Sequence, residues 1–369
     1  MAPKTSVEVP GNMKKSGSTI PAKSFSRLLL KWNQDQNRRE MPWKGEKDPY
    51  KIWLSEIILQ QTRVEQGLQY YHDFIRNFPT IQDLAGAKDE KVLKCWEGLG
   101  YYSRCRNLLA TARYICNELD GRFPDQYETI LSLKGVGPYT AAAISSFAYN
   151  LPHAVVDGNV FRVLARVFGI SLPSDSTEGK KYFTKLANEL LDQEQAGKYN
   201  QAIMDFGATI CKPVSPLCGS CVFKKSCQAF QQDKIADYPV KEKKIRVKKR
   251  WFHFLVLACK GKIAIRQRTD KDIWQGLYEF PNLESGKPLT TAALIKEARQ
   301  KKWLSSGIKT TTAISPWHKQ QLTHQLIHGQ FIRISLPKKP ELPGLLWLSE
   351  KEIKQYAFPR LFREYLEAL

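Results

Sequence analysis

The segment 133–159 constrains the fold of this chain more than any other part of the sequence. It contains a Gly-Val-Gly turn at 135–137 between two helical patterns, and then a lone carboxylate, Asp157, at the start of a further helix. Glycines allow close approach to the backbone, and the free amides at the start of a helix attract anions. The segment therefore predicts a helical hairpin that can bind an anion. The alternative is an ordinary helix–loop–helix followed by an aspartate that caps a helix.

The net charge favours a polyanionic partner. The chain has 57 Lys and Arg residues against 36 Asp and Glu residues, a formal net charge of +21. Such an excess supplies affinity for nucleic acid without sequence choice. A membrane is not the expected partner, because no apolar run approaches the roughly 20 residues that a span needs. Residues 1–24 are typical of a disordered basic tail and not of a signal peptide. We expect a cytoplasmic protein, associated with the nucleoid if its source is bacterial.

Four of the eight cysteines are clustered in the segment 211–227. Their spacing is Cys211-x6-Cys218-x2-Cys221-x5-Cys227. In a reducing compartment four such thiols favour a metal site over disulfides. Structural zinc sites usually show paired short spacings, whereas all-cysteine ligation with wider loops suits a 4Fe–4S cluster. The spacing favours the iron–sulfur cluster, with zinc as the alternative.

Hydrophobic periodicity and punctuation by Pro, Gly and Asn predict a helical domain over residues 25–231. Its helices are expected near 25–37, 50–77, 90–98, 103–119, 126–132, 138–149, 159–169, 178–193 and 198–210.

A charged linker is expected at 232–250, because seven of the ten residues 241–250 are Lys or Arg. Such a run is typical of a solvated tether, and it could also contact a DNA backbone. The composition changes at Trp251. Residues 252–258 and 262–268 flank a Lys-Gly-Lys turn and predict a β-hairpin, which opens a second domain at 251–369.

Several motifs now identify a family. The cysteine loop, about fifty residues after the aspartate of the hairpin, resembles that of the endonuclease III superfamily. Within it, SEIILQQT at 55–62 and GLGYYSR at 98–104 resemble the adenine DNA glycosylases, the MutY family. The resemblance implies a mainly α helix-hairpin-helix DNA glycosylase with an iron–sulfur cluster loop. WQGLYEFP at 274–281 resembles the opening of a Nudix fold and implies a C-terminal α+β Nudix-like domain. The metal-binding box of Nudix hydrolases is absent from 282–303, so pyrophosphatase chemistry is not expected.

The resemblance implies a base-excision repair enzyme that removes adenine mispaired with 8-oxoguanine (or guanine) from double-stranded DNA. We expect the protein to be a monomer. Cleaving this N-glycosidic bond requires protonation of the leaving base and stabilisation of a cationic sugar. Glu56 lies on an apolar helix, where we expect burial to raise its pKa and make it the proton donor. Asp157 begins a helix, where free amides favour the anion, and Asn159 could orient it. The alternatives are a satisfied buried acid and a helix cap.

The residue at position 139, a tyrosine, distinguishes a monofunctional glycosylase from a glycosylase that also cleaves the strand. Endonuclease III-type lyases carry a lysine just after the hairpin, and this lysine forms an imine with the abasic sugar. A tyrosine cannot do so, which predicts a monofunctional enzyme with Tyr139 in the catalytic pocket. The alternative is a buried aromatic residue at the start of a helix. Two other classes are a glycosylase–lyase for oxidised pyrimidines, which would need lysine at 139, and a non-catalytic DNA-binding iron–sulfur protein, which would need neither carboxylate.

Further residues follow from the resemblance. The family's adenine-pocket positions correspond to Arg39, Trp43, Leu59 and Asp205; many relatives carry Glu where this chain has Asp205. Gln61 and Tyr101 match residues that wedge into the duplex, and Gly135 and Gly137 would offer amides to a phosphate. The family reads 8-oxoguanine with a Phe-Ser-His loop. Here the matching residues are Leu322, Thr323 and His324, which keep a wedge, a hydroxyl and an imidazole.

Overall fold

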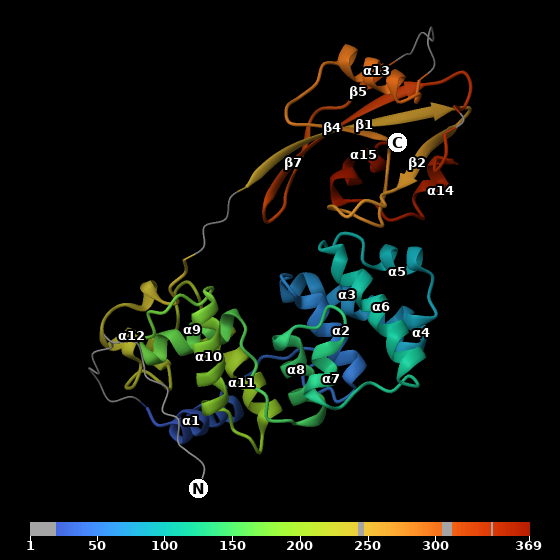
Figure 1. The fold of residues 1–369 in the computed structure, drawn as a ribbon. Coiled ribbons are helices and arrows are strands. Elements are labelled where there is room, and N and C mark those ends of the chain that lie inside the picture. Colours follow the sequence, from blue (N-terminus) through green and yellow to red (C-terminus); the bar gives the residue numbers. More distant parts are fainter. Residues whose placement is uncertain (1–19, 243–246, 305–311, 341) are drawn as a thin grey trace. The chain divides into compact units, whose positions relative to one another are not determined.

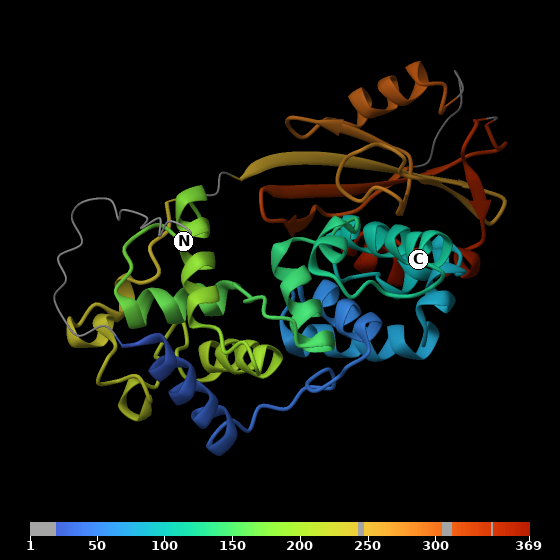
Figure 2. The same ribbon diagram turned by 60° about the horizontal axis from the view of Figure 1, so that its bottom comes forward.

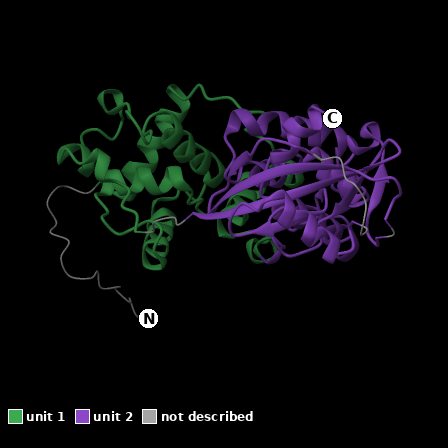
Figure 3. Ribbon diagram, turned by 90° about the horizontal axis from the view of Figure 1, so that it is seen from above, with its two compact units in different colours: residues 1–52, 125–131, 137–243 green, residues 53–124, 132–136, 244–369 purple. Residues whose placement is uncertain are grey.

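The structure is a computed structural model that describes residues 20–242, 247–304, 312–340 and 342–369. Its residues group by contact into two compact units (Figure 3). The first unit comprises 1–52, 125–131 and 137–243, and the second comprises 53–124, 132–136 and 244–369. Most of the tail expected at 1–24 lies outside the described residues, and helix α1 already begins at Ala22.

The first unit is helical (Figure 1). Helix α9 illustrates why these residues form helices: a capping residue stands at each end, and the apolar residues between them recur at helical spacing. Asp157 caps the helix, Val160, Val163, Leu164 and Val167 are buried at helical spacing, and Gly169 ends it with φ +63°. The unit comprises α1 (Ala22–Asp35), α7 (Tyr127–Ser132), α8 (Pro138–Tyr149), α9 (Gly158–Phe168), α10 (Thr177–Leu190), α11 (Ala196–Thr209), η1 (Cys218–Ser220), α12 (Gln228–Gln231) and η2 (Ile235–Asp237).

The long helix expected at 50–77 is wrong. The chain instead forms α2 (Pro49–Leu59) and α3 (Val64–Asn77), which are separated by a turn in which Gln61 has φ +56°. A left-handed backbone cannot continue a helix, and the surrounding contacts must hold it. The apolar periodicity on both sides of the turn concealed this break.

Helix α4 (Ile81–Ala85) was not expected. Thr80 and Asp83 form a reciprocal capping box at its start, a signal that was present in the sequence. The remaining helices of this region are α5 (Asp89–Cys95) and α6 (Tyr102–Glu118).

The C-terminal part of the second unit contains an eight-stranded sheet. Strands β1 and β2 form the expected hairpin around Lys260 and Gly261, both with positive φ as a type I′ turn requires. The sheet's strand order is β3-β2-β1-β7-β5, with β1 and β7 parallel. The strands are β1 (Lys248–Cys259), β2 (Lys262–Gln267), β3 (Tyr278–Glu279), β4 (Asn282–Ser285), β5 (Thr312–Ile314), β6 (His318–Gln321), β7 (Gln325–Ser335) and β8 (Leu346–Leu348).

The end of the expected linker belongs to this sheet. Strand β1 starts at Lys248, and the side chain of Arg250 is buried between Asp272 and Glu284, 2.6 Å from an oxygen of each. A basic run usually stays in water, but two carboxylates compensate the burial of this guanidinium. The expectation that the linker extends to 250 is therefore wrong at its end.

Helices cover the two faces of the sheet. On one face α13 (Thr291–Gln300) lies over β1 and β7 (Figure 2), with Leu294 and Ala298 in a core cluster that includes Leu255 and Ile332. On the other, Phe331 packs with aromatic rings from η3 (Arg360–Phe362) and α15 (Arg363–Glu367). The short helix α14 (Glu350–Ile353) precedes these two elements in the chain. No helix of the described residues is long and apolar enough to cross a membrane.

Contacts within the second unit join its helices to its sheet region. The ammonium of Lys94 donates to the carbonyl of Tyr356 at 3.0 Å, and the Glu97 carboxylate accepts from the Phe358 amide at 2.8 Å. Arg106 donates to the carbonyl of Gln275. Residues 53–124 are therefore tied to the C-terminal region by polar contacts.

Candidate active site

The Gly-Val-Gly turn has the geometry that the sequence predicts. The Val136 amide donates to the Leu133 carbonyl at 3.0 Å, and α8 begins directly after it with Pro138 at its first position. Gly135 has φ +81°, and a Cβ there would lie 2.7 Å from the Cβ of Asn107. At Gly137 a Cβ would meet nothing within 4 Å. The backbone thus requires glycine at 135, whereas glycine at 137 leaves open space in front of a helix start.

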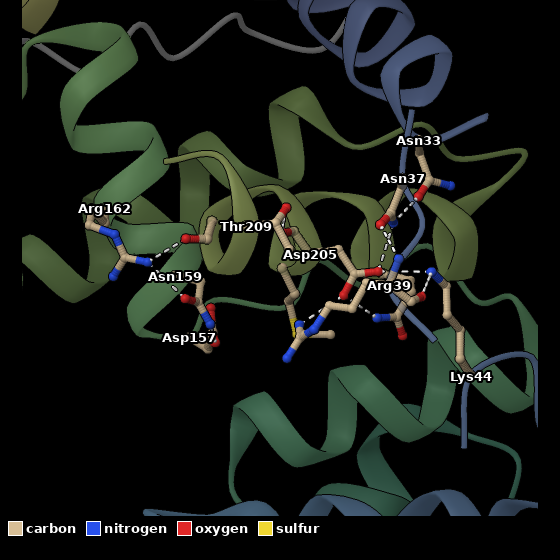
Figure 4. Close-up of polar contacts among 12 residues, drawn as sticks. Asn33, Asn37, Arg39, Lys44, Asp157, Asn159, Arg162, Asp205 and Thr209 are labelled. Atoms are coloured by element: carbon tan, nitrogen blue, oxygen red, sulfur yellow. Dashed lines mark hydrogen bonds and ion pairs between the residues drawn. The ribbon is translucent and has the colours of Figure 1, made fainter. Parts of the chain in front are cut away.

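Asp157 is held by hydrogen bonds to both carboxylate oxygens. Its Oδ1 accepts from the Val160 amide at 2.8 Å and its Oδ2 from the Asn159 side chain at 2.7 Å (Figure 4). Burial raises the pKa of this carboxyl above its usual value, and these two donors and the Arg162 charge oppose the rise. The helix start therefore does not by itself set the ionisation, because loss of water around the carboxylate acts in the opposite direction.

Arg162 extends this network to the cysteine loop. Its Nη2 donates to Asn159 Oδ1 at 2.8 Å and to the Gly207 carbonyl at 2.7 Å, while its Nε donates to the Cys211 carbonyl at 2.7 Å. Sequence reasoning missed this residue. Its position three residues after Asn159, on the same helix, was the available signal.

Asp205 accepts four hydrogen bonds and is fully buried. Arg39 and Gln201 donate to Oδ1 at 2.9 and 3.1 Å, and Asn37 and Lys44 donate to Oδ2 at 2.8 and 3.0 Å (Figure 4). A carboxylate has about four lone-pair sites, and all are occupied. The structure therefore brings Arg39 and Asp205 together. The Asp205 carboxylate holds two cations, the side chains of Arg39 and Lys44, in fixed orientations. Lys44 and Asn37 also donate to this carboxylate, and the sequence did not reveal them as residues of the site.

The other expected pocket residues occupy different parts of the fold. Tyr139, in the first turn of α8, is half-buried and its hydroxyl donates to the sulfur of Met204 at 3.5 Å. Trp43 is buried in the same unit. In the second unit Glu56 is buried on α2, as expected for a proton donor in an apolar setting, and Leu59 is half-buried at the end of that helix.

The residues that we expect to wedge into the duplex and to read the lesion line one cavity of the second unit. Gln61 and Tyr101 both have left-handed backbones, with φ +56° and +47°. The reader loop 322–324 joins β6 to β7, and its Thr323 hydroxyl is hydrogen-bonded to the hydroxyl of Tyr101. The cavity has a volume of about 540 Å³, and its lining includes Gln61, Tyr101, Leu322, Thr323 and His324. Five residues assigned from separate motifs are thus brought to one place.

The four clustered cysteines are free thiols in the first unit. Burial raises the pKa of the Cys211, Cys221 and Cys227 thiols, that of Cys221 to about 12, and neighbouring thiols of the same set contribute to each shift. Arg166 contacts the Cys211 sulfur at 3.6 Å, so a cation stands beside the first thiol. Among the described residues no three such ligands are close enough to hold a single metal ion. Four cysteine thiols on one loop, with an arginine beside the first, fit a group that has four cysteine ligands and a negative charge.

Comparison with known proteins agrees with this geometry. The model of the HhH-GPD superfamily of base excision DNA repair proteins matches residues 54–190, and the NUDIX domain matches 253–368. A solved thermostable thymine-DNA glycosylase aligns with a TM-score of 0.53 and 32% identity, covering 57% of this chain and 97% of that chain. The protein is thus a helix-hairpin-helix base-excision DNA glycosylase with a C-terminal Nudix-like domain, as the expected fold class stated.

Relatives that align with most of the chain define the family more closely. The adenine DNA glycosylase of Buchnera aphidicola subsp. Acyrthosiphon pisum is 34% identical and covers 93% of this chain and 97% of its own. That of Rattus norvegicus is 32% identical over 93% of this chain and 78% of its own. The chain belongs to the adenine DNA glycosylase family.

Proposed function

We propose that this glycosylase removes adenine opposite 8-oxoguanine by hydrolysis and leaves the abasic strand intact. The observation that carries the proposal is the cavity shared by Gln61, Tyr101 and the reader loop 322–324. Wedge residues enter the stack where a base has been flipped out, and polar groups beside them can contact the base opposite. Thr323 and His324 are exposed on this loop and provide such groups.

Two carboxylates divide the chemistry in this proposal. Glu56, buried on an apolar helix, donates a proton to the leaving adenine. Asp157 stabilises the cationic sugar, and Asn159 keeps its carboxylate in one orientation through the 2.7 Å hydrogen bond. Arg39, held by Asp205, contributes to the pocket for the flipped base together with Trp43 and Leu59. Gly135 and Gly137 offer backbone amides to a phosphate at the start of α8.

The monofunctional assignment rests on Tyr139. Its phenol cannot form an imine with the abasic sugar, so the strand cleavage that begins with a lysine lacks its nucleophile there.

A 4Fe–4S cluster held by Cys211, Cys218, Cys221 and Cys227 is the cofactor we propose. When bound, such a cluster cross-links its loop through four iron–thiolate bonds. The spacing of the four cysteines favours a cluster over zinc, because only one pair is short and the outer gaps are six and five residues, whereas structural zinc sites usually show paired short spacings. The partner is a DNA duplex that contains the mispair, bound by a monomer of the protein in the cytoplasm or nucleoid.

Single-turnover excision on matched duplexes tests the proposal. Adenine is placed opposite 8-oxoguanine, guanine or thymine. Each reaction is split into two samples, and strand breaks are measured with and without alkali treatment. We expect the fastest base release opposite 8-oxoguanine and strand breaks only after alkali. Equal rates opposite all three bases would contradict the lesion assignment, whereas breaks without alkali would contradict only the monofunctional assignment.

A further inference from the structure

Arg104 occupies an unusual position in the second unit, since its guanidinium binds carbonyl oxygens at the end of a helix. Its Nη1 donates to the carbonyls of Ile57, Ile58 and Gln60 at 2.6, 3.1 and 2.6 Å. These are carbonyls of the last turn of α2 and of the turn after it, which have no partner within their own helix. A cation at this end is also favoured by the helix dipole.

The same guanidinium contacts the loop before α6. Its Nη2 donates to the Gly100 carbonyl at 3.3 Å, and its carbon lies 5.2 Å from the ring centre of Trp96 and 5.5 Å from that of Tyr101. Trp96 itself donates to the Gly100 carbonyl at 3.0 Å. One side chain therefore binds the carbonyl directly before Gln61 and the carbonyl directly before Tyr101.

Holding the Arg104 guanidinium in this position costs free energy, because the charge is partly removed from water. Loss of water lowers the pKa of Arg104 to about 10, which still leaves it protonated near neutral pH. Its Nε is shut off from solvent and has no hydrogen-bond partner in the described part of the chain, and no ion pair is formed with a carboxylate there. A half-buried cation that is balanced by carbonyls and aromatic faces, without a carboxylate among the described residues, is expensive to retain.

The residues that follow these two carbonyls have strained backbones. Gln61 and Tyr101 have positive φ, which non-glycine residues rarely adopt and which persists only where surrounding contacts enforce it. Both side chains line the 540 Å³ cavity, and Tyr101 is 44% exposed. The strain is therefore located at the two proposed wedges, and the contacts that enforce it converge on Arg104.

We infer that Arg104 is a positioning residue that holds Gln61 and Tyr101 in the conformations needed to wedge into the duplex, so that it acts on base flipping through these two side chains. This inference rests on the proposed function, because it assumes that Gln61 and Tyr101 are the wedges. In the proposed mechanism Arg104 itself contacts neither the base nor the sugar.

The test uses the full chain with Arg104→Lys, which keeps the positive charge but replaces the planar fork by a single ammonium. Arg104→Met is a second variant that keeps the apolar stem. Arg113→Met is the matched control: Arg113 lies on the same helix and donates to the Ala85 and Ala87 carbonyls at the end of α4, away from the wedges. Circular dichroism and thermal unfolding identify any variant that does not fold.

Flipping is measured by the fluorescence of 2-aminopurine in place of the target adenine, and duplex affinity by anisotropy. For Arg104→Lys we expect flipping and single-turnover excision to fall at least about tenfold while duplex affinity changes much less. Arg113→Met should flip the base like the wild type. Adding Arg104→Lys to the Gln61→Ala, Tyr101→Ala double variant should cause no further loss, because residues that act through one another are not additive.

The outcomes separate the inference from its premise. If Gln61→Ala and Tyr101→Ala are impaired but Arg104→Lys flips the base normally, or if its effect adds to theirs, the inference is wrong and the proposed function stands. If Gln61→Ala and Tyr101→Ala flip the base normally, the wedge assignment fails and the inference fails with it. A loss in Arg113→Met equal to that in Arg104→Lys would mean that helix capping in general, and not the wedges, is responsible.

Discussion

At Asp157, one of the two proposed catalytic carboxylates, burial and hydrogen bonding act on the pKa in opposite directions. Asp157 accepts from Val160 and Asn159, which favours the anion, yet burial raises its pKa. Near neutral pH an anion in such a setting interacts strongly with a developing positive charge, because little water screens it. Glu56 is buried without a helix start beside it. The different surroundings of the two acids suit different roles.

Asp157→Asn and Glu56→Gln should each reduce single-turnover base release by at least about a hundredfold, because each change removes electrostatic stabilisation or proton donation in the transition state. Duplex affinity should stay close to the wild type, since side-chain volume is kept and asparagine also caps helices well. Quenched-flow excision and anisotropy measure the two quantities. Wild-type rates in both variants would remove the carboxylates from the mechanism.

The raised pKa of Asp157 also predicts a pH dependence. Excision should decline as the pH falls through this pKa, which lies above 3.8, because the anion is lost. The native state holds this proton more strongly than the unfolded chain, so ionisation costs stability as the pH rises through the raised pKa. Urea unfolding at pH values from 3.8 up to the raised pKa should therefore show a smaller loss of stability for Asp157→Asn than for the wild type. Parallel pH profiles would contradict a raised pKa.

Tyr139→Lys should introduce strand cleavage through an imine that borohydride traps, because an amine would then stand in the first turn of α8. Tyr139→Phe is the control and should trap nothing. Gel mobility of the protein–DNA adduct is the measurement. Efficient trapping by the wild type would show that another amine acts as nucleophile.

At the scale of elements, turns carry much of the proposed site. The hairpin 135–137, the turn around Gln61, the loop before α6 and the reader loop 322–324 each join two regular elements. Loops held by a rigid scaffold commonly carry binding residues, because their backbone groups remain accessible. The cysteine loop after α11 is another such connection, and Arg162 and Arg166 on α9 hold its backbone.

The two glycines of the hairpin should respond differently to alanine. Gly135→Ala would force a Cβ to 2.7 Å from the Asn107 Cβ at φ +81°, whereas at Gly137 a Cβ meets nothing within 4 Å. Gly135→Ala should lower the free energy of unfolding by about 1–3 kcal/mol and weaken duplex binding, because the strained turn must shift. Gly137→Ala should leave stability within about 0.5 kcal/mol. Chemical denaturation and anisotropy measure the pair, and equal stabilities would contradict the steric argument.

The cysteine loop should carry iron. Anaerobically purified protein should be brown and contain about four irons per chain without stoichiometric zinc, because four cysteine thiolates hold one cluster. Cys218→Ser should lower the iron content and destabilise the loop between α11 and α12. Metal analysis with absorption spectroscopy checks both statements. A colourless zinc protein with full excision activity would contradict the cluster.

For the whole molecule, the two contact units do not follow the two domains expected from the chain order. Residues 53–124 lie in one unit with the C-terminal sheet region, tied by Lys94, Glu97 and Arg106. Removal of the C-terminal region would leave those three side chains without these partners. Lesion recognition in the proposed function is therefore a property of a unit built from two distant parts of the sequence.

His324→Ala should reduce the preference for 8-oxoguanine over guanine, since each polar contact to a base contributes about 1–3 kcal/mol. Excision opposite guanine should change less. A chain that ends at residue 250 should lose more of this preference and unfold at a lower temperature, because the ties to 53–124 are lost. Single-turnover rates on both duplexes are the measurement. If the shortened chain discriminates as well as the full chain, the helices read the lesion and the loop 322–324 does not.

Features with local causes were predictable. The Asp157 cap, the hairpin before α8 and the β1–β2 turn each depend on a few adjacent residues, and the structure has all three. The cysteine spacing and the motifs around Glu56 and Tyr101 indicated the family, which the full-length relatives confirm. Adjacent residues interact in almost any fold, so their chemistry can be read from the sequence.

Tertiary structure decided the features that depend on burial and on distant partners. The sequence contained no sign that Asp205 would be saturated by four donors, that Arg250 would be buried in the sheet, or that Arg104 would bind two separate turns. The break at Gln61 depends on contacts from another helix, not on the apolar pattern around it. Whether a charge stays in water or is buried depends on which side chains the fold brings to it, and only the folded chain determines that.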